Sequence, residues 1–182
     1  MPRAEERVFL MDLRVKRTRR SIMNAFIHLR AERPIEKITV KELAEKAMIN
    51  KATFYLHYKD IYDLSEQLED ELLDESLAEI PEEAFLEPDG FRQMAFIFSS
   101  PSELFTTLFS GSRVDHAVRK LDRKIKEIIF AQRPELKDDL AANAKLTAAI
   151  YGCFHAFFLY KNEDFDTVTE ALAEFCTGKI LS

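Results

Sequence analysis

Residues 39–60 contain the pattern that most limits how this chain can fold. Thr39 and Glu42 have the spacing of a capping box, in which a hydroxyl and a carboxylate each accept a hydrogen bond from an amide at the start of a helix. Apolar residues then recur at the three- and four-residue intervals of a helix with one buried face: Val40, Leu43, Ala44 and Ala47. Asn50 is placed to cap a second short helix. The sequence therefore predicts two short helices joined by a turn of about three residues, the helix-turn-helix pattern.

The second short helix is predicted to bury Phe54 and Tyr58 and to expose hydrogen-bond donors. These donors, which precede the first carboxylate at Asp60, are Lys51, Thr53, Tyr55, His57 and Lys59. Ammonium, hydroxyl and imidazole groups suit phosphate oxygens and the edges of bases. The alternative is that these side chains form only the solvated face of a small helix.

Residues 38–44, the run from Ile49 to Asp60, and Leu64 resemble the DNA-binding domain of the TetR family of bacterial transcriptional regulators. The resemblance covers residues 14–65 and is most specific at Thr53-Phe54-Tyr55-Leu56-His57-Tyr58-Lys59. It implies an all-α protein of about nine helices. A three-helix helix-turn-helix domain would occupy residues 14–62, and a larger helical domain for dimerisation and ligand binding would occupy residues 63–182.

The resemblance also implies which residues lie at the DNA. Contacts to phosphates or nearby bases are implied for Thr53, Tyr55 and His57. Reading of the base sequence is implied for the positions at which family members vary, Asn50, Lys51 and Ala52. The DNA-facing set is completed by Thr39 and Lys59. Many members have Gly where this chain has Met48. A positive φ costs a non-Gly residue about 1 kcal/mol, so this departure leaves the exact geometry of the turn open but not the motif.

The charges are divided unevenly along the chain. The net charge of -6 would by itself argue against a nucleic-acid partner. However, residues 1–60 hold 14 Lys and Arg against 8 Asp and Glu, a net charge of +6, and residues 61–182 hold 12 against 24, a net charge of -12. Such segregation is expected where one end of a protein approaches a phosphate backbone.

A basic run at residues 14–20 is expected to begin the first helix, after a frayed arm over residues 1–13. Positive charge at a helix start opposes the helix macrodipole unless anions lie nearby. We therefore place Arg17 at DNA phosphates. The alternative is a basic lead-in segment that has no partner.

The C-terminal residues carry a predicted dimer interface. Residues 146–160 are apolar almost all round, which is typical of a helix buried on more than one side, and in a chain of this size we expect a second copy to cover it. Small residues spaced by four leave room for a facing helix: Ala148, Gly152 and Ala156. A last helix, capped by Asp164, presents a further apolar seam of Phe165, Val168, Leu172 and Phe175. The family resemblance implies a four-helix bundle here; packing inside one subunit is the alternative.

Together these features predict a sequence-specific transcriptional regulator that binds double-stranded DNA as a homodimer. Repression is the predicted mode of regulation. Its two recognition helices would read the half-sites of a palindromic operator about 34 Å apart. A small apolar or aromatic effector is predicted to modulate DNA affinity from a pocket lined by Phe91, Met94, Phe98, Phe105, Phe109 and Tyr151. Ordinary core packing is the alternative for these residues. The alternative mechanism is control by a partner protein, which includes activation in place of repression.

Other classes of function have no support in the sequence. It contains no Gly-rich phosphate loop, no Gly-x-Ser-x-Gly and no His-Glu-x-x-His, so we expect no enzyme and no cofactor. Cys153 and His155 point to different sides of a helix, so we expect no metal site there. The longest apolar run, residues 148–160, is too short to span a bilayer, and the N-terminus has no apolar export segment. The expected location is the cytoplasm.

Overall fold

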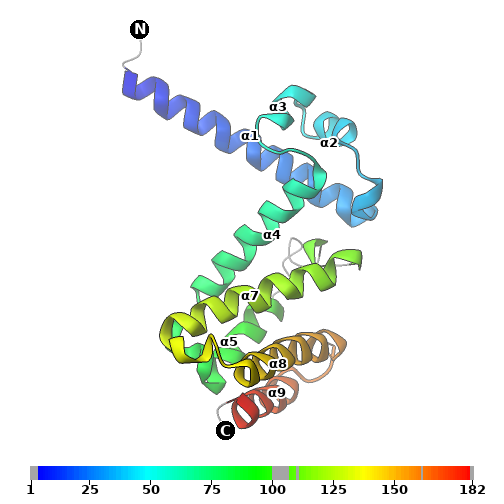
Figure 1. Cartoon of the computed structure of the whole chain (residues 1–182). Helices are drawn as coiled ribbons and strands as arrows, with labels where there is room; N and C mark the ends of the chain where they lie inside the picture. Colours follow the sequence, from blue (N-terminus) through cyan, green and yellow to red (C-terminus); the bar gives the residue numbers. More distant parts are fainter. Residues whose placement is uncertain (1–3, 100–106, 110, 161, 181–182) are drawn as a thin grey trace. The chain divides into compact units, whose positions relative to one another are not determined.

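The computed structural model describes residues 4–99, 107–109, 111–160 and 162–180, and over these residues it contains helices and no strands (Figure 1). The all-α prediction is therefore confirmed for the described chain. Two compact units are present. The first comprises the described residues within Met1–Glu69 and Thr106–Gly111, and the second those within Asp70–Phe105 and Ser112–Ser182. None of the described helices combines the length and apolar composition needed to cross a membrane.

The first unit is built from α1 (Ala4–Glu32), α2 (Val40–Lys46), α3 (Lys51–Tyr55) and the beginning of α4 (Ile61–Ala78), with a 3-10 turn at Ile35–Lys37. Helix α2 packs against both α1 and α3. The fully buried core side chains of this unit include Ile22, Phe26, Leu43, Phe54 and Leu64. The predicted helix-turn-helix is thus present, with α1 as its support.

Helix α1 begins well before the basic run. We expected a frayed arm over residues 1–13. For the described residues of this range the prediction is wrong, since the helix starts at Ala4. Residues 3–33 contain neither Gly nor Pro and are rich in Ala, Leu, Glu and Arg, which favour a helix even where no apolar period marks it. The basic run therefore lies inside α1 and not at its start, so the macrodipole gives no reason for anions there.

The turn between α2 and α3 places Met48 in the left-handed region, with φ of 55°. The amide of Ile49 donates to the Ala44 carbonyl at 2.9 Å, and the amide of Met48 donates to the Glu45 carbonyl at 3.2 Å. This pair of bonds is the Schellman ending of a helix, which normally places Gly at the residue with positive φ. The turn geometry that the sequence left open at Met48 is therefore the left-handed one, although the residue is not Gly.

Replacing Met48 by Gly is expected to raise the free energy of unfolding by up to about 1 kcal/mol, because Gly adopts this φ without steric cost. The Met48 side chain is 92% exposed, so its loss removes little packing. Urea denaturation would measure the shift in midpoint. Met48→Ala is the matched control: it also shortens the side chain but keeps the Cβ. Equal midpoints for the Gly and Ala variants would contradict the assignment of strain to this turn.

The second unit contains the rest of α4 with α5 (Pro88–Ser99), α7 (Val114–Gln132), α8 (Leu140–Leu159) and α9 (Phe165–Ile180). Short 3-10 turns lie at Glu82–Leu86 and Pro134–Leu136, and a third, Gly111–Arg113, begins on the last residue of the first unit. Helix α9 packs against α5 and α8, and α8 packs against α7. The predicted cap of the last helix is confirmed, since the Thr167 amide donates to Asp164 Oδ2 at 2.9 Å.

The segment predicted as a plain connection, residues 81–90, is more ordered than expected. It forms the Glu82–Leu86 turn and the beginning of α5. Gly90 is buried there, and a Cβ at this position would lie 1.9 Å from the Ala84 carbonyl oxygen. Glycine is therefore required for the close approach of the turn to α5.

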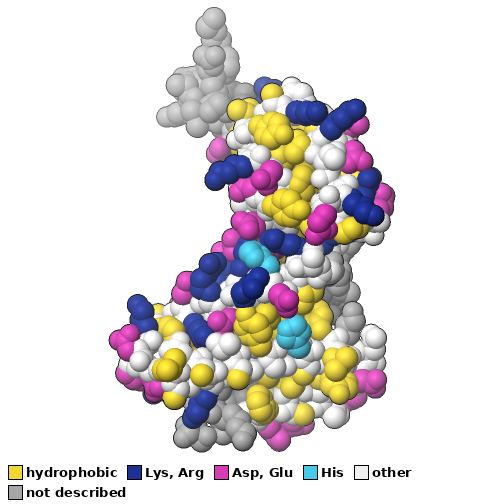
Figure 2. All heavy atoms as spheres, turned by 45° about the vertical axis from the view of Figure 1, so that its right-hand side comes forward, with side chains coloured by type: hydrophobic (Ala, Val, Ile, Leu, Met, Phe, Trp, Pro, Cys, Tyr) yellow, Lys and Arg dark blue, Asp and Glu magenta, His cyan; other side chains and the backbone are white. Residues whose placement is uncertain are grey.

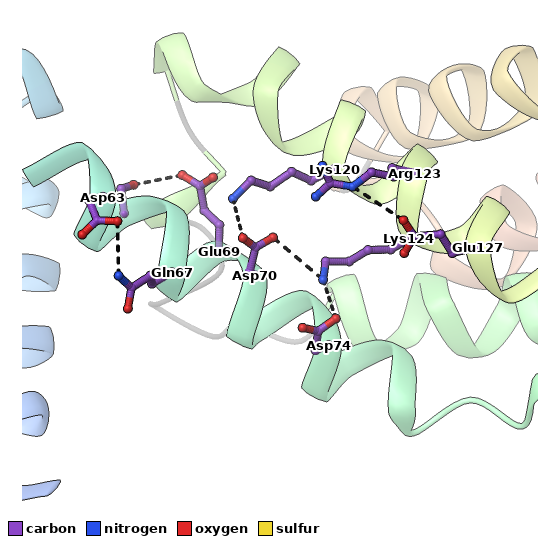
Figure 3. A network of polar contacts seen from close by, with 10 residues as sticks. Asp63, Gln67, Glu69, Asp70, Asp74, Lys120, Arg123, Lys124 and Glu127 are labelled. Atoms are coloured by element: carbon purple, nitrogen blue, oxygen red, sulfur yellow. Dashed lines mark hydrogen bonds and ion pairs between the residues drawn. The ribbon is translucent and has the colours of Figure 1, made fainter. Parts of the chain in front are cut away.

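Ion pairs join the second half of α4 to α7 (Figure 3). Lys120 Nζ lies 3.2 Å from Asp70 Oδ2, and the Lys120 side chain is almost completely buried. Lys124 Nζ lies 3.8 Å from Asp70 Oδ1 and also pairs with Asp74. Acidic residues of α4 thus meet basic residues of α7 inside this unit.

Candidate nucleic-acid interface

Helix α3 is held in place by its cap and by two aromatic side chains. Asn50 Oδ1 accepts hydrogen bonds from the Thr53 amide at 2.6 Å and from the Thr53 hydroxyl at 2.9 Å. Phe54 and Tyr58 are 0% and 3% exposed, which confirms their predicted burial. The side-chain oxygen of Asn50 and the hydroxyl of Thr53, two groups that were predicted to face DNA, are therefore hydrogen-bonded to each other.

The outer face of α3 presents a mixed surface. Lys51 and Ala52 are exposed, Tyr55 is 57% exposed, and Leu56 at the C-cap is 82% exposed. His57 is half-buried in the turn that follows α3. In the space-filling view, hydrophobic side chains lie among Lys and Arg side chains on this unit (Figure 2). The set of DNA-facing residues predicted from the sequence did not include Leu56. Its outward position could have been predicted, because Leu56 lies four residues after Ala52 and two residues after the inward Phe54.

The start of α2 shows the predicted capping box. The Thr39 hydroxyl accepts from the Glu42 amide at 3.3 Å, and the Thr39 amide donates to Glu42 Oε2 at 3.2 Å. Hydrogen bonds from the Thr39 hydroxyl and then its amide, with a smaller effect of Arg33, lower the pKa of Glu42. A lowered pKa means that this cap stabilises the fold at neutral pH and is lost as the pH falls through the folded-state pKa. Thr39 is exposed, but its hydroxyl proton is directed to Glu42 at 2.8 Å.

The entry to α4 fixes the backbone of Lys59. Its amide donates to Asp63 Oδ2 at 2.8 Å, and the Asp63 amide donates to Asp60 Oδ1 at 2.8 Å, as expected of a cap at Asp60. The hydrogen bond from the Lys59 amide lowers the pKa of Asp63. Lys59 itself is exposed. Its ammonium group therefore extends from a rigid turn next to α3.

The basic run on α1 is divided between structural and exposed residues. Arg19 Nε donates to the Tyr58 hydroxyl at 3.4 Å and so links α1 to the segment after α3. The exposed cations of the run are Arg14, Lys16, Arg17 and Arg20. The predicted phosphate ligand Arg17 is thus exposed, and Arg19 takes part in positioning α3.

The predicted dimer residues lie on α8 and α9. Ala148 and Gly152 are exposed, Ala156 is half-buried, and the buried residues of α8 at Leu146, Ala149 and Cys153 face the other way. On α9, Val168 and Leu172 are half-buried, and Phe165 and Phe175 are 36% and 45% exposed. Every predicted interface position except Gly152, which has no side chain, thus carries a partly uncovered apolar side chain.

The predicted pocket residues are distributed over both units. Phe91 and Met94 on α5 and Tyr151 on α8 are half-buried in the second unit. Phe109 is buried in the first unit. The side chain of Phe98 and the whole of Phe105 lie outside the described residues. Of the predicted set, only Phe91, Met94 and Tyr151 are therefore described together in one unit.

Residues 22–68, from the second half of α1 to the first half of α4, match the family model described as bacterial regulatory proteins, tetR family. A search of curated proteins found no match to the chain. The matched range contains the capping box, α3 and both of its flanking turns.

Proposed function

We propose that this DNA-binding transcriptional regulator, whose N-terminal domain matches the TetR family, is a homodimeric repressor of a palindromic operator. The observation that supports this most directly is the outer face of α3. This face is exposed on a helix anchored by Phe54 and Tyr58, and no carboxylate lies between Asn50 and Lys59. A regulator of transcription acts on chromosomal DNA, so we place the protein in the cytoplasm.

Phosphate binding is assigned to cations and hydroxyls around α3. Lys51 and Lys59 lie at the two ends of the α3 segment, with Tyr55 and His57 between them, and Arg17 extends from α1. Each Lys or Arg that neutralises a phosphate releases counterions and adds about one unit to the slope of log affinity against log salt. The α3 side chains that remain exposed are then available to bases.

Dimerisation is assigned to α8 and α9. Along α8, residues at intervals of three and four are exposed and small or apolar apart from one imidazole: Ala148, Gly152, His155 and Leu159. Leu159 is 74% exposed. The small residues Ala148 and Gly152 let a second helix approach closely, and Leu159 offers it apolar surface. One short recognition helix buries too little surface for tight specific binding, so a dyad that pairs two copies would supply the rest.

Control by a small apolar or aromatic effector is also part of the proposal. Phe91, Met94 and Tyr151 offer half-buried apolar and aromatic surface in the second unit. The effector needs to favour one arrangement of the dimer by only about 1 to 3 kcal/mol to change DNA affinity 5- to 150-fold.

The test is the binding of the purified full chain to duplexes that it selects from genomic fragments. We expect affinity to fall steeply with salt, and Lys51→Ala to weaken binding and reduce the salt slope by about one unit without lowering Tm. Fluorescence anisotropy over a salt series measures both quantities. Lys137→Ala, which removes an exposed Lys of the second unit, is the control. Absence of any salt-sensitive binding to duplex DNA would overturn the proposed function.

A further inference from the structure

The polar groups of α3 that ordinarily read bases are largely engaged within the protein. Asn50 Oδ1 accepts hydrogen bonds from both the amide and the hydroxyl of Thr53. An Asn that reads adenine uses its side-chain oxygen and its side-chain NH2 group together, and here the oxygen is already occupied. The Thr53 hydroxyl proton is directed to the same oxygen and not outward. What the exposed face of α3 presents is therefore one ammonium at Lys51, the phenol of Tyr55, and the apolar side chains of Ala52 and Leu56.

Ala52 and Leu56 lie on the same side of α3. The Leu56 amide donates to the Ala52 carbonyl at 3.2 Å, so the helical turn extends through the C-cap and places the two side chains one turn apart. Leu56 is 82% exposed and Ala52 is exposed. Together they form an apolar strip beside the Lys51 ammonium and the Tyr55 ring, on the face opposite to buried Phe54.

An apolar strip on a recognition helix has one specific partner in the major groove. Of the four bases, only thymine presents a methyl group there, and apolar side chains distinguish it by contact and not by hydrogen bonding. Polar base edges placed against Leu56 would lose water without gaining a bond, which costs free energy. The exposed side chain of Leu56 is thus complementary to thymine and unfavourable for cytosine.

We propose that α3 reads thymine 5-methyl groups through Leu56, with Ala52 beside it, so that the operator half-site contains A·T pairs opposite these two residues. The inference rests on the proposed DNA-binding function and specifies the base sequence that the same site selects. Lys51 and Tyr55 then supply phosphate or flanking contacts, and the apolar strip supplies the discrimination between T·A and C·G.

The test replaces thymine by deoxyuridine, one position at a time, in a duplex selected by the wild-type protein. This exchange removes only the methyl group. We expect the wild-type protein to bind about fourfold more weakly at each thymine whose methyl is buried, from the transfer free energy of one methyl group. Leu56→Ala should bind the thymine duplex more weakly and should no longer distinguish thymine from deoxyuridine at one of these positions.

Leu140→Ala is the matched control, because Leu140 is 83% exposed on α8 and the substitution is the same. It should retain both the affinity and the thymine preference. Wild-type binding that is salt-sensitive but indifferent to deoxyuridine at every position would overturn the methyl reading and leave the proposed function standing. If the Leu56→Ala variant still preferred thymine to deoxyuridine at every position, Leu56 would not be the residue that contacts the methyl group. Absence of duplex binding by the wild type would overturn the function itself.

Discussion

Gly152→Leu is expected to convert the proposed dimer to folded monomers and to lower operator affinity by a factor of 100 or more. Gly152 is exposed on α8, and apart from its chain neighbours and the adjacent backbone of α8 no heavy atom lies within 4 Å of a Cβ built at this position, so a single subunit accommodates the new side chain. Leu is also favoured over Gly inside a helix by roughly 1 kcal/mol. In the proposed dimer the same side chain enters a close helix contact twice, at about 1 to 3 kcal/mol each.

Sedimentation equilibrium would measure the dissociation of the dimer, and circular dichroism would show that the subunit stays helical. Operator affinity should fall because the second half-site no longer binds intramolecularly, an advantage of about 100- to 10,000-fold when two sites are linked. Gly152→Ala is the graded control and should remain dimeric, since Ala already occupies positions 148 and 156. A Gly152→Leu protein with an unchanged dimer dissociation constant would exclude this stripe as the interface.

Lys120→Ala is expected to lower the free energy of unfolding by about 2 kcal/mol. Removing one partner of a fully buried ion pair costs about 3 to 5 kcal/mol, because the other charge is left uncompensated. Here the Asp70 side chain is 40% exposed and keeps Lys124 at 3.8 Å, so water and the second cation reduce that cost. The Lys120 side chain is only 8% exposed, and its apolar stem also loses packing.

Urea denaturation at a fixed protein concentration measures this loss, since the stability of the proposed dimer would depend on concentration. Arg123→Ala is the control on the same helix: its side chain is 61% exposed and lies 4.0 Å from Glu127, a pair worth a few tenths of a kcal/mol. Combining Lys120→Met with Asp70→Asn should recover much of the loss because no charge is then stranded. A single Lys120→Ala variant as stable as Arg123→Ala would show that the pair contributes nothing.

Much of the helix-turn-helix was determined by residues close together in the sequence. The capping box of Thr39 and Glu42, the cap at Asn50 and the left-handed turn at Met48 each involve partners within five residues, so their physical causes are visible in a short stretch of sequence. The residues around Asn50 and Tyr55 also led to the family that the match over residues 22–68 supports. The early start of α1 was missed because those residues favour a helix without showing an apolar period.

Contacts between distant residues could only be decided by the tertiary structure. Leu108 and Phe109 are buried in the first unit, where Arg30 Nη2 donates to the Thr107 carbonyl at 3.1 Å, although the sequence placed Phe109 with the pocket. Lys120 meets Asp70 from another helix, and no periodicity identifies which of the many carboxylates of α4 it meets. Caps, turns and helical faces depend on interactions between neighbouring residues, so a short stretch of sequence determines them. Which helical faces meet depends on how the helices fill a common core, and only the tertiary structure decides that.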